Sequence, residues 1–146
     1  MTGEPISGRC LCGAVSLHVA GAYDPAPGAC HCRMCQRWSG AVFLAFDVQR
    51  DALTVTGPVA TYASSSFAER AFCSVCGSHL WLRDTGPGET LYELMPGLFD
   101  AARDWPLRSE VYADRAMASV TLTGDHRRTT QADYEMKNLF VEGNAP

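Results

Sequence analysis

The sequence predicts a mostly β fold with little helix. Apolar and polar residues alternate over short stretches such as AVSLHVA at 14–20, a period of two that is typical of strands with one buried face. Turn-forming residues separate these stretches, for example Gly86, Pro87 and Gly88. Only two stretches have a helical pattern. These three observations favour short strands joined by tight turns.

Six stretches are expected to form strands, at 14–20, 41–48, 52–57, 79–84, 90–96 and 117–124. In each of them, alternation places the apolar side chains on one face. A single helical turn is expected at 32–38. A short helix is expected at 131–140, with Tyr134, Leu139 and Phe140 pointing inward.

Length and composition indicate one globular domain over residues 1–146. With 47% hydrophobic and 19% charged residues, the chain can bury a core and does not have the composition of a disordered protein. We find no repeat, low-complexity tract or long linker in the sequence. A single domain is therefore expected.

Charge and hydropathy argue against several classes of partner. The formal net charge is −4 and there is no basic run, which disfavours nucleic acids and anionic membranes. The first ten residues lack the basic and apolar regions of a secretory signal, and no apolar run approaches the roughly 18 residues of a membrane span. We therefore expect a cytoplasmic protein whose thiols stay reduced.

The seven cysteines form three compact groups. They are Cys10 and Cys12 as CxC, Cys30, Cys32 and Cys35 as CxCxxC, and Cys73 and Cys76 as CxxC. Such spacings hold sulfur atoms close together on tight turns, which is the local geometry of a tetrahedral zinc site. Zinc is therefore the expected cofactor.

Seven thiolates divide naturally into four and three. A closed structural zinc site uses four thiolates, whereas a reactive zinc keeps three protein ligands and an open fourth position. The two doublets can supply the closed site, and the CxCxxC triplet can supply the open, catalytic one. Other partitions stay open, including one in which His31, His79 or His126 completes the triplet as a second structural site.

Two other roles for the cysteines were weighed. Both CxxC segments match the thioredoxin-like spacing, but that chemistry expects a βαβ unit and a helix N-terminus, which the sequence does not show. Buried free cysteines can act as small hydrophobic residues, which suits single cysteines better than clustered groups. Metal binding therefore accounts best for the pattern.

Four longer motifs, three of which contain the cysteine groups, occur in a characteristic order and spacing. They are GRCLCGAV at 8–15, CHCRMCQRWSGA at 30–41, YASSSFAERAFCSVCGSHLW at 62–81 and MPGLFD at 95–100. They resemble the glutathione-dependent formaldehyde-activating enzyme family, to which the centromere protein V domain also belongs. The resemblance implies several small coiled antiparallel sheets gathered around two Zn²⁺ ions. It implies a structural zinc on Cys10, Cys12, Cys73 and Cys76 and a catalytic zinc on Cys30, Cys32 and Cys35.

The sequence departs from the family pattern at 110–119. Family members often carry a His-Ile-aromatic strand followed by Pro-Trp, whereas this chain reads EVYADRAMAS, with Glu110, Met117 and Ala118. The resemblance therefore does not determine the substrate preference.

An open zinc with three thiolate ligands favours sulfur chemistry. Three thiolates overcompensate the charge of Zn²⁺, so the metal is a weaker Lewis acid toward water than one bound by neutral histidines. An incoming thiol, in contrast, is readily deprotonated by such a metal. The resemblance implies a carbon–sulfur lyase similar to S-(hydroxymethyl)glutathione synthase, which adds a small thiol such as glutathione to a small aldehyde such as formaldehyde.

Three arginines are the expected substrate contacts. Glutathione carries two carboxylates, and the guanidinium groups of Arg33, Arg37 and Arg70 are placed near the cysteine groups in the sequence, where each can bind a carboxylate. The proton donor to the nascent alkoxide stays open among water, His31 and Glu69.

The alternative function is a non-catalytic zinc module that binds another protein. The odd seventh thiol argues against it, because two closed four-cysteine sites need eight thiols. A zinc nucleobase deaminase is disfavoured because the chain has no HxE or CxE motif ahead of a PCxxC. The oligomeric state is not determined by the sequence.

Overall fold

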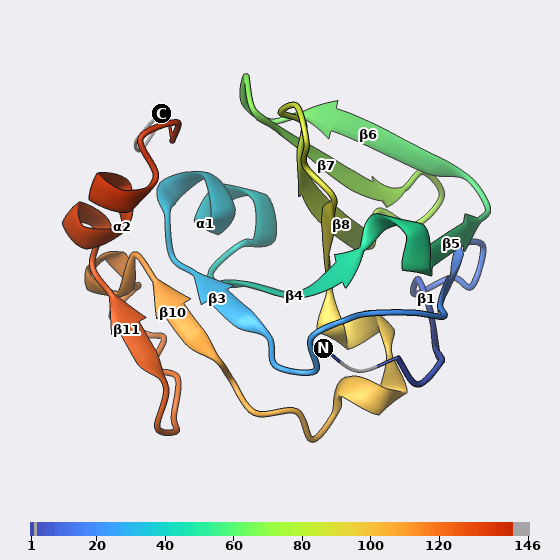
Figure 1. Cartoon of the computed structure of the whole chain (residues 1–146), viewed down its shortest axis with the longest axis horizontal. Coiled ribbons are helices and arrows are strands. Elements are labelled where there is room, and N and C mark those ends of the chain that lie inside the picture. Colours follow the sequence, from blue (N-terminus) through green and yellow to red (C-terminus); the bar gives the residue numbers. More distant parts are fainter. Residues whose placement is uncertain (2, 142–146) are drawn as a thin grey trace. The chain divides into compact units, whose positions relative to one another are not determined.

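The structure is a computed structural model that describes residues 1 and 3–141. Its contacts divide the chain into two compact units. The first contains Met1–Pro25 and Ala45–Trp105, and the second contains Ala26–Leu44 and the chain from Pro106 onward. Strands outnumber helices in the described residues, so the mostly β fold is confirmed (Figure 1). The single domain stays a prediction.

The first unit contains two antiparallel sheets. The smaller sheet has the order β1-β2-β5, formed by β1 (Ile6–Arg9), β2 (Ser16–Val19) and β5 (Leu53–Thr56). In the larger sheet the strands follow the order β4-β9-β8-β7-β6. They are β4 (Phe43–Gln49), β9 (Leu91–Leu94), β8 (His79–Asp84), β7 (Ala68–Cys73) and β6 (Val59–Ala63).

Alternation along the strands builds the apolar core of the first unit. In β2, Leu17 and Val19 are buried while Ser16 and His18 face solvent, as the period of two predicts. Aromatic rings fill the interior beside these strands. Phe46 packs edge-on against Phe99 and Trp105, and Trp105 stacks on Tyr23.

The second unit has a small parallel sheet and two short helices. Strand β10 (Ser109–Val111) pairs in parallel with both β3 (Gly28–Cys30) and β11 (Arg127–Thr129). Helix α1 (Arg33–Ser39) follows β3, and helix α2 (Gln131–Lys137) follows β11. Short 3₁₀ turns complete the two units, at η1 (Arg50–Ala52), η2 (Pro96–Leu98), η3 (Asp100–Ala102) and η4 (Ala113–Arg115).

Most local predictions hold, but one predicted strand does not form. The helical turn at 32–38 is confirmed as α1, but no strand forms at 117–124. That segment turns back on itself, with the Val120 N–H donating to the Met117 carbonyl, although Val120 and Leu122 are half-buried. Alternation alone does not make a strand where the backbone turns instead of pairing with a neighbouring strand. The strands β1, β3, β6, β7, β10 and β11 were not predicted.

The terminal helix is shorter than predicted. It ends at Lys137, so Leu139 and Phe140 lie beyond it and are 88% and 55% exposed. Tyr134 is half-buried and its ring lies against Tyr112. The inward orientation is therefore confirmed for the tyrosine only, because the two later residues have left the helical face.

Candidate metal centres

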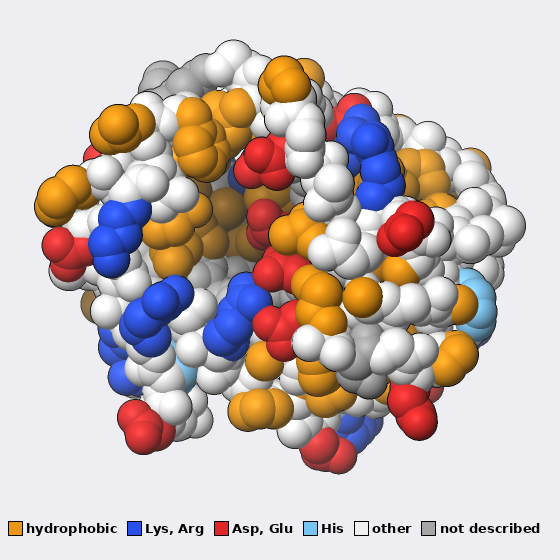
Figure 2. Space-filling model, viewed as in Figure 1, with side chains coloured by type: hydrophobic (Ala, Val, Ile, Leu, Met, Phe, Trp, Pro, Cys, Tyr) orange, Lys and Arg blue, Asp and Glu red, His pale blue; other side chains and the backbone are white. Residues whose placement is uncertain are grey.

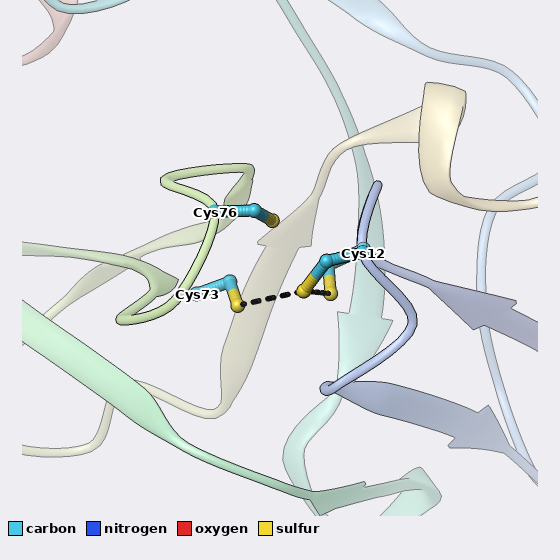
Figure 3. A group of neighbouring side chains, drawn as sticks. Cys12, Cys73 and Cys76 are labelled. Atoms are coloured by element: carbon cyan, nitrogen blue, oxygen red, sulfur yellow. Dashed lines mark hydrogen bonds between the residues drawn. The ribbon is translucent and has the colours of Figure 1, made fainter.

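Four cysteines meet between two turns of the first unit. Cys10 and Cys12 lie in the turn that follows β1, Cys73 ends β7, and Cys76 lies in the turn before β8. Their sulfur atoms all lie within 4.8 Å of one another. Figure 3 shows the side chains of Cys12, Cys73 and Cys76 pointing toward a common centre. The structure thus brings together the four cysteines predicted from the two doublets.

Both turns owe their shape to a glycine after the second cysteine. The Gly13 N–H donates to the Cys10 carbonyl, and the Gly77 N–H donates to the Cys73 carbonyl. Both glycines have φ near +78°, at +79° and +77°, where a side chain would be strained. The same residue type therefore closes both turns and directs two cysteine side chains inward.

The spacing of the sulfur atoms fits a metal better than a disulfide. A tetrahedron with zinc–sulfur bonds of about 2.3 Å places sulfur atoms about 3.8 Å apart, whereas a disulfide needs about 2.0 Å. The sulfur of Cys12 lies 3.6 Å from that of Cys10 and 3.9 Å from that of Cys73. All seven cysteines are free thiols. The four-cysteine group can therefore hold a metal ion without rearrangement.

Ser78 links the two turns beside this group. Its hydroxyl oxygen accepts a hydrogen bond from the Leu11 N–H at 3.0 Å and lies 3.2 Å from the sulfur of Cys76. The hydrogen bond from this hydroxyl lowers the pKa of the Cys76 thiol to about 5. A thiolate at Cys76 is therefore favoured, and a thiolate is the form that binds metals.

The CxCxxC triplet forms a second group within the second unit. Cys30 ends β3, Cys32 is the N-cap of α1, and Cys35 lies in the first turn of α1. The three sulfur atoms lie within 4.8 Å of one another, and the Cys35 N–H donates to the sulfur of Cys32 at 3.4 Å. The helix start therefore folds the second and third cysteines back toward the first.

The triplet favours one thiolate among its three thiols. Hydrogen bonds from the Cys30 thiol, and then from the Cys35 thiol, lower the pKa of Cys32 to about 3. The same contact with Cys32 raises the pKa of Cys30 well above its ordinary value. Negative charge is thus concentrated on Cys32, the cysteine that caps α1. A cation placed among the three sulfurs would relieve the competition between them.

The comparisons with known proteins agree with this arrangement. Residues 5–115 match the family model of the glutathione-dependent formaldehyde-activating enzyme. The chain belongs to this family. A protein of Schizosaccharomyces pombe named as an uncharacterized lyase is 36% identical over 108 residues, which cover 73% of this chain and 77% of the relative.

Two further proteins resemble this member of the family. A protein of Halomonas elongata, provisionally named a glutathione-dependent formaldehyde-activating enzyme, is 32% identical over 88 residues, covering 54% of this chain and 56% of the relative. The crystal structure of a Rhodobacter sphaeroides protein aligns with a TM-score of 0.55 at 21% identity, covering 85% of this chain and all of that one. That likeness shows the fold alone.

Histidines do not join either cysteine group among the described residues. His31 lies between Cys30 and Cys32 in the sequence, but its ring is directed at Glu110. His126 contacts the same carboxylate, and His79 belongs to β8 of the first unit. The hypothesis that a histidine completes the triplet therefore has no support in this structure.

Sequence analysis missed the buried carboxylate that organises the second unit. Glu110 is 5% exposed, and its two oxygens lie 2.7 Å from His31 Nε2 and 2.5 Å from His126 Nε2. Burial raises the pKa of Glu110, but the hydrogen bonds from His126 and His31 outweigh burial and leave that pKa below its ordinary value. The signal in the sequence was Glu110 itself, at the position where the chain departs from its family.

The three predicted substrate-binding arginines fall in different surroundings. Arg33 and Arg37 are exposed on α1, and their spacing of four places them on one face of the helix, opposite the buried Cys35. Arg70 is buried in β7 of the first unit. Glu69, one of the candidate proton donors, forms an ion pair with Arg83 in the same unit at 3.0 Å. The structure thus brings two of the three arginines to the helix that carries the triplet.

Basic residues are concentrated in the second unit. Seven of the twelve Arg and Lys residues lie there, whereas ten of the sixteen acidic residues lie in the first unit. Figure 2 shows Lys and Arg side chains gathered near β10, β11 and α2 on the viewed face. The unit that carries the triplet therefore presents the more positive surface, which favours an anionic ligand. Among the described residues, no helix is long and apolar enough to span a membrane.

Proposed function

We propose that this chain is a zinc-dependent carbon–sulfur lyase in which the CxCxxC triplet holds the catalytic ion and the four-cysteine group holds a structural ion. The observation that carries the proposal is the difference in ligand number. One group offers four cysteines and the other offers three, and among the described residues no histidine or carboxylate ligand atom joins either group. Three protein ligands are typical of a catalytic zinc, which keeps one position for a ligand.

A zinc ion at the triplet would supply an electrophilic position where a thiol loses its proton readily. In the net reaction the sulfur of the thiol bonds to the aldehyde carbon, and the proton lost from sulfur ends on the carbonyl oxygen. The product is a hemithioacetal, and the reverse reaction releases thiol and aldehyde. Atoms and charge balance without an oxidant or reductant.

Residues of α1 would bind and orient the thiol. We assign Arg33 and Arg37 to the carboxylates of an anionic thiol of the glutathione class, because both guanidinium groups are exposed on the helix that begins within the triplet. Holding the thiol and the aldehyde in one site raises the rate by lowering the entropic cost of their encounter. The surplus of basic residues in the second unit supports an anionic substrate.

The direct test follows formation of the adduct by nuclear magnetic resonance. Glutathione and ¹³C-formaldehyde are mixed, and the exchange between free aldehyde and hemithioacetal is measured with and without the protein. We expect acceleration by the wild-type chain and none by Cys35→Ser. The double variant Arg33→Gln/Arg37→Gln is expected to raise KM for glutathione but not for 2-mercaptoethanol, a thiol without carboxylates.

Three results would contradict the proposal. An unchanged exchange rate across a panel of thiols and aldehydes would remove the lyase activity and favour a non-catalytic zinc module. Metal analysis that finds one zinc per wild-type chain would remove the catalytic ion. Full activity of Cys35→Ser would place the chemistry elsewhere in the protein.

A further inference from the structure

We infer that Glu110 is a positioning residue for the triplet, acting through His31 to hold Cys30 and Cys32 in the geometry that binds the metal. The inference rests on the proposed function, since it requires a metal ion at the triplet. It goes beyond that function because it assigns a role to a carboxylate that lies outside the group of ligands.

His31 is held at three separate points. Its N–H donates to the Val111 carbonyl at 3.1 Å, and its carbonyl accepts from the Gln36 side-chain amide at 2.8 Å. Its ring nitrogen Nε2 lies 2.7 Å from Glu110, and the whole residue is only 1% exposed. Backbone and ring are therefore both fixed, by β10 on one side and by α1 on the other.

The cysteines on either side must follow any movement of His31. Adjacent Cα atoms are 3.8 Å apart across a trans peptide, so a rotation at His31 displaces both Cys30 and Cys32. A metal site tolerates only small errors in ligand position, and groups that orient the ligands change metal affinity by about 10–100-fold when removed. The ring contact, together with the two backbone hydrogen bonds, thus fixes the residue between two of the three ligands.

Glu110 is itself anchored from two strands. It lies opposite Ala29 of β3 and opposite Arg128 of β11 in the sheet. One carboxylate oxygen faces His31, and the other faces His126 and the Arg128 guanidinium, at 3.3 Å from Nε. A buried carboxylate that keeps its charge needs such partners. Because both oxygens are engaged, the side chain has little freedom to turn away from His31.

The arrangement explains a buried charge that the core of the unit does not require. An apolar residue at 110 would fill the space between β3 and β11 without the cost of removing a charge from water. The glutamate instead joins β11 to the residue between two ligands. The His31 nitrogen Nδ1 has no hydrogen-bond partner in the structure, so Glu110 is the one anchor of the ring among the described residues.

The test measures how fast metal leaves the triplet. Chelator-driven release of metal is followed over time for the wild type and for Glu110→Gln. The kinetic phase of release that is missing in Cys35→Ser is assigned to the triplet. We expect Glu110→Gln to release the triplet metal at least about tenfold faster, with the four-cysteine phase unchanged. Cobalt-substituted protein gives a second measurement, since the visible d–d bands report the geometry of the sulfur ligands.

A double-mutant cycle separates positioning from general loosening. His31→Phe keeps a ring but cannot donate to the carboxylate, and it is expected to match Glu110→Gln. The double variant His31→Phe/Glu110→Gln is expected to be no worse than His31→Phe alone, because His31→Phe already removes the contact that Glu110→Gln weakens. If the two effects multiply instead, Glu110 acts by another route and the inference fails.

Two control variants complete the design. Glu135→Gln removes a carboxylate of the same unit that accepts from the Tyr112 hydroxyl at 3.1 Å, and it is expected to release metal like the wild type. His126→Phe removes the other histidine on Glu110 and is expected to have a smaller effect than His31→Phe. The comparison of His126→Phe with His31→Phe tests the inference even if Glu110→Gln does not fold. Equal effects of these two variants on metal release would overturn the inference.

The outcome also distinguishes the inference from the proposed function. A wild-type chain with metal in the four-cysteine group alone would overturn both. A wild-type chain with two metals, whose triplet phase is unaffected by Glu110→Gln, would overturn only the role of Glu110.

Discussion

The two cysteine groups differ in the length of chain that each one closes. The four-cysteine group joins residues 10–12 to residues 73–76, whereas the triplet lies entirely within residues 30–35. Closing a loop of some sixty residues removes more freedom from the unfolded chain than closing one of five, by about 2 kcal/mol in the simple loop-entropy estimate. A metal in the first group therefore stabilises the fold more than a metal in the second.

The surroundings of the two groups also differ. Cys10 and Cys73 belong to the apolar core of the first unit and are almost completely buried. The triplet lies beside polar and charged residues, among them His31 and Glu110. The comparison teaches that the same residue type joins two distant segments in one unit and closes a single short segment in the other.

The largest effect is expected for Cys73→Ser. The substitution removes a fully buried ligand of the four-cysteine group, and a structural zinc site contributes much of the folding free energy of small domains. We expect the free energy of unfolding to fall by more than about 4 kcal/mol. Urea unfolding followed by circular dichroism measures it, with Ser74→Ala on the exposed neighbouring residue as the control. A loss below about 1 kcal/mol would break the comparison.

A much smaller loss of stability is expected for Cys35→Ser. The substitution removes one of three local ligands, so the zinc content should fall from two ions to one per chain. The free energy of unfolding should change by less than about 1 kcal/mol, because no long loop is released. Metal analysis and urea unfolding on the same sample check both values. Unfolding as severe as that of Cys73→Ser would make the triplet a structural site.

A pH-dependent effect is expected at His79 of the first unit. Burial, and then the positive charge of Arg70, lower the pKa of His79 below its ordinary 6.5. The unfolded state therefore binds a proton more readily, so the stability from neutral His79 is present above pH 6.5 and is lost as the pH falls through the lowered pKa. His79→Gln should flatten the slope of stability against pH below 6.5.

Urea midpoints measured between pH 7.5 and pH 5 provide the test of this slope. The control is His18→Gln, which replaces an exposed histidine of β2 in the same unit. Parallel curves for the wild type and His79→Gln would show that His79 does not contribute to the pH dependence.

The most local effect is expected for Thr130→Ala at the start of α2. The Thr130 hydroxyl accepts a hydrogen bond from the Asp133 N–H at 3.2 Å and caps the helix. Losing such a cap costs about 1 kcal/mol. Thr130→Ser should restore the stability, as measured by thermal unfolding. Release of either metal ion in Thr130→Ala would show that α2 supports a metal site as well as its own helix.

Local patterns in the sequence were sufficient for the cysteine groups and for several elements. The spacings CxC and CxxC place sulfur atoms together through short turns, and both turns formed around Gly13 and Gly77. The helical turn at 32–38 was predicted from its local pattern, and Cys32 acts as the cap of α1. Interactions between residues a few positions apart depend on few degrees of freedom, so the sequence pattern determines them.

Tertiary structure alone decided which distant segments meet. The sheet of β3, β10 and β11 consists of strands of three residues, which are too short to show a period of two. The contact between His31 and Glu110 joins residues 79 positions apart, and nothing near either residue in the sequence specifies it. The alternating segment 117–124 formed no strand because its backbone closes a turn at Met117–Val120. The sequence by itself thus determined which cysteines form each group, whereas long-range packing decided what holds them in place, because pairing energies between distant segments depend on the whole fold.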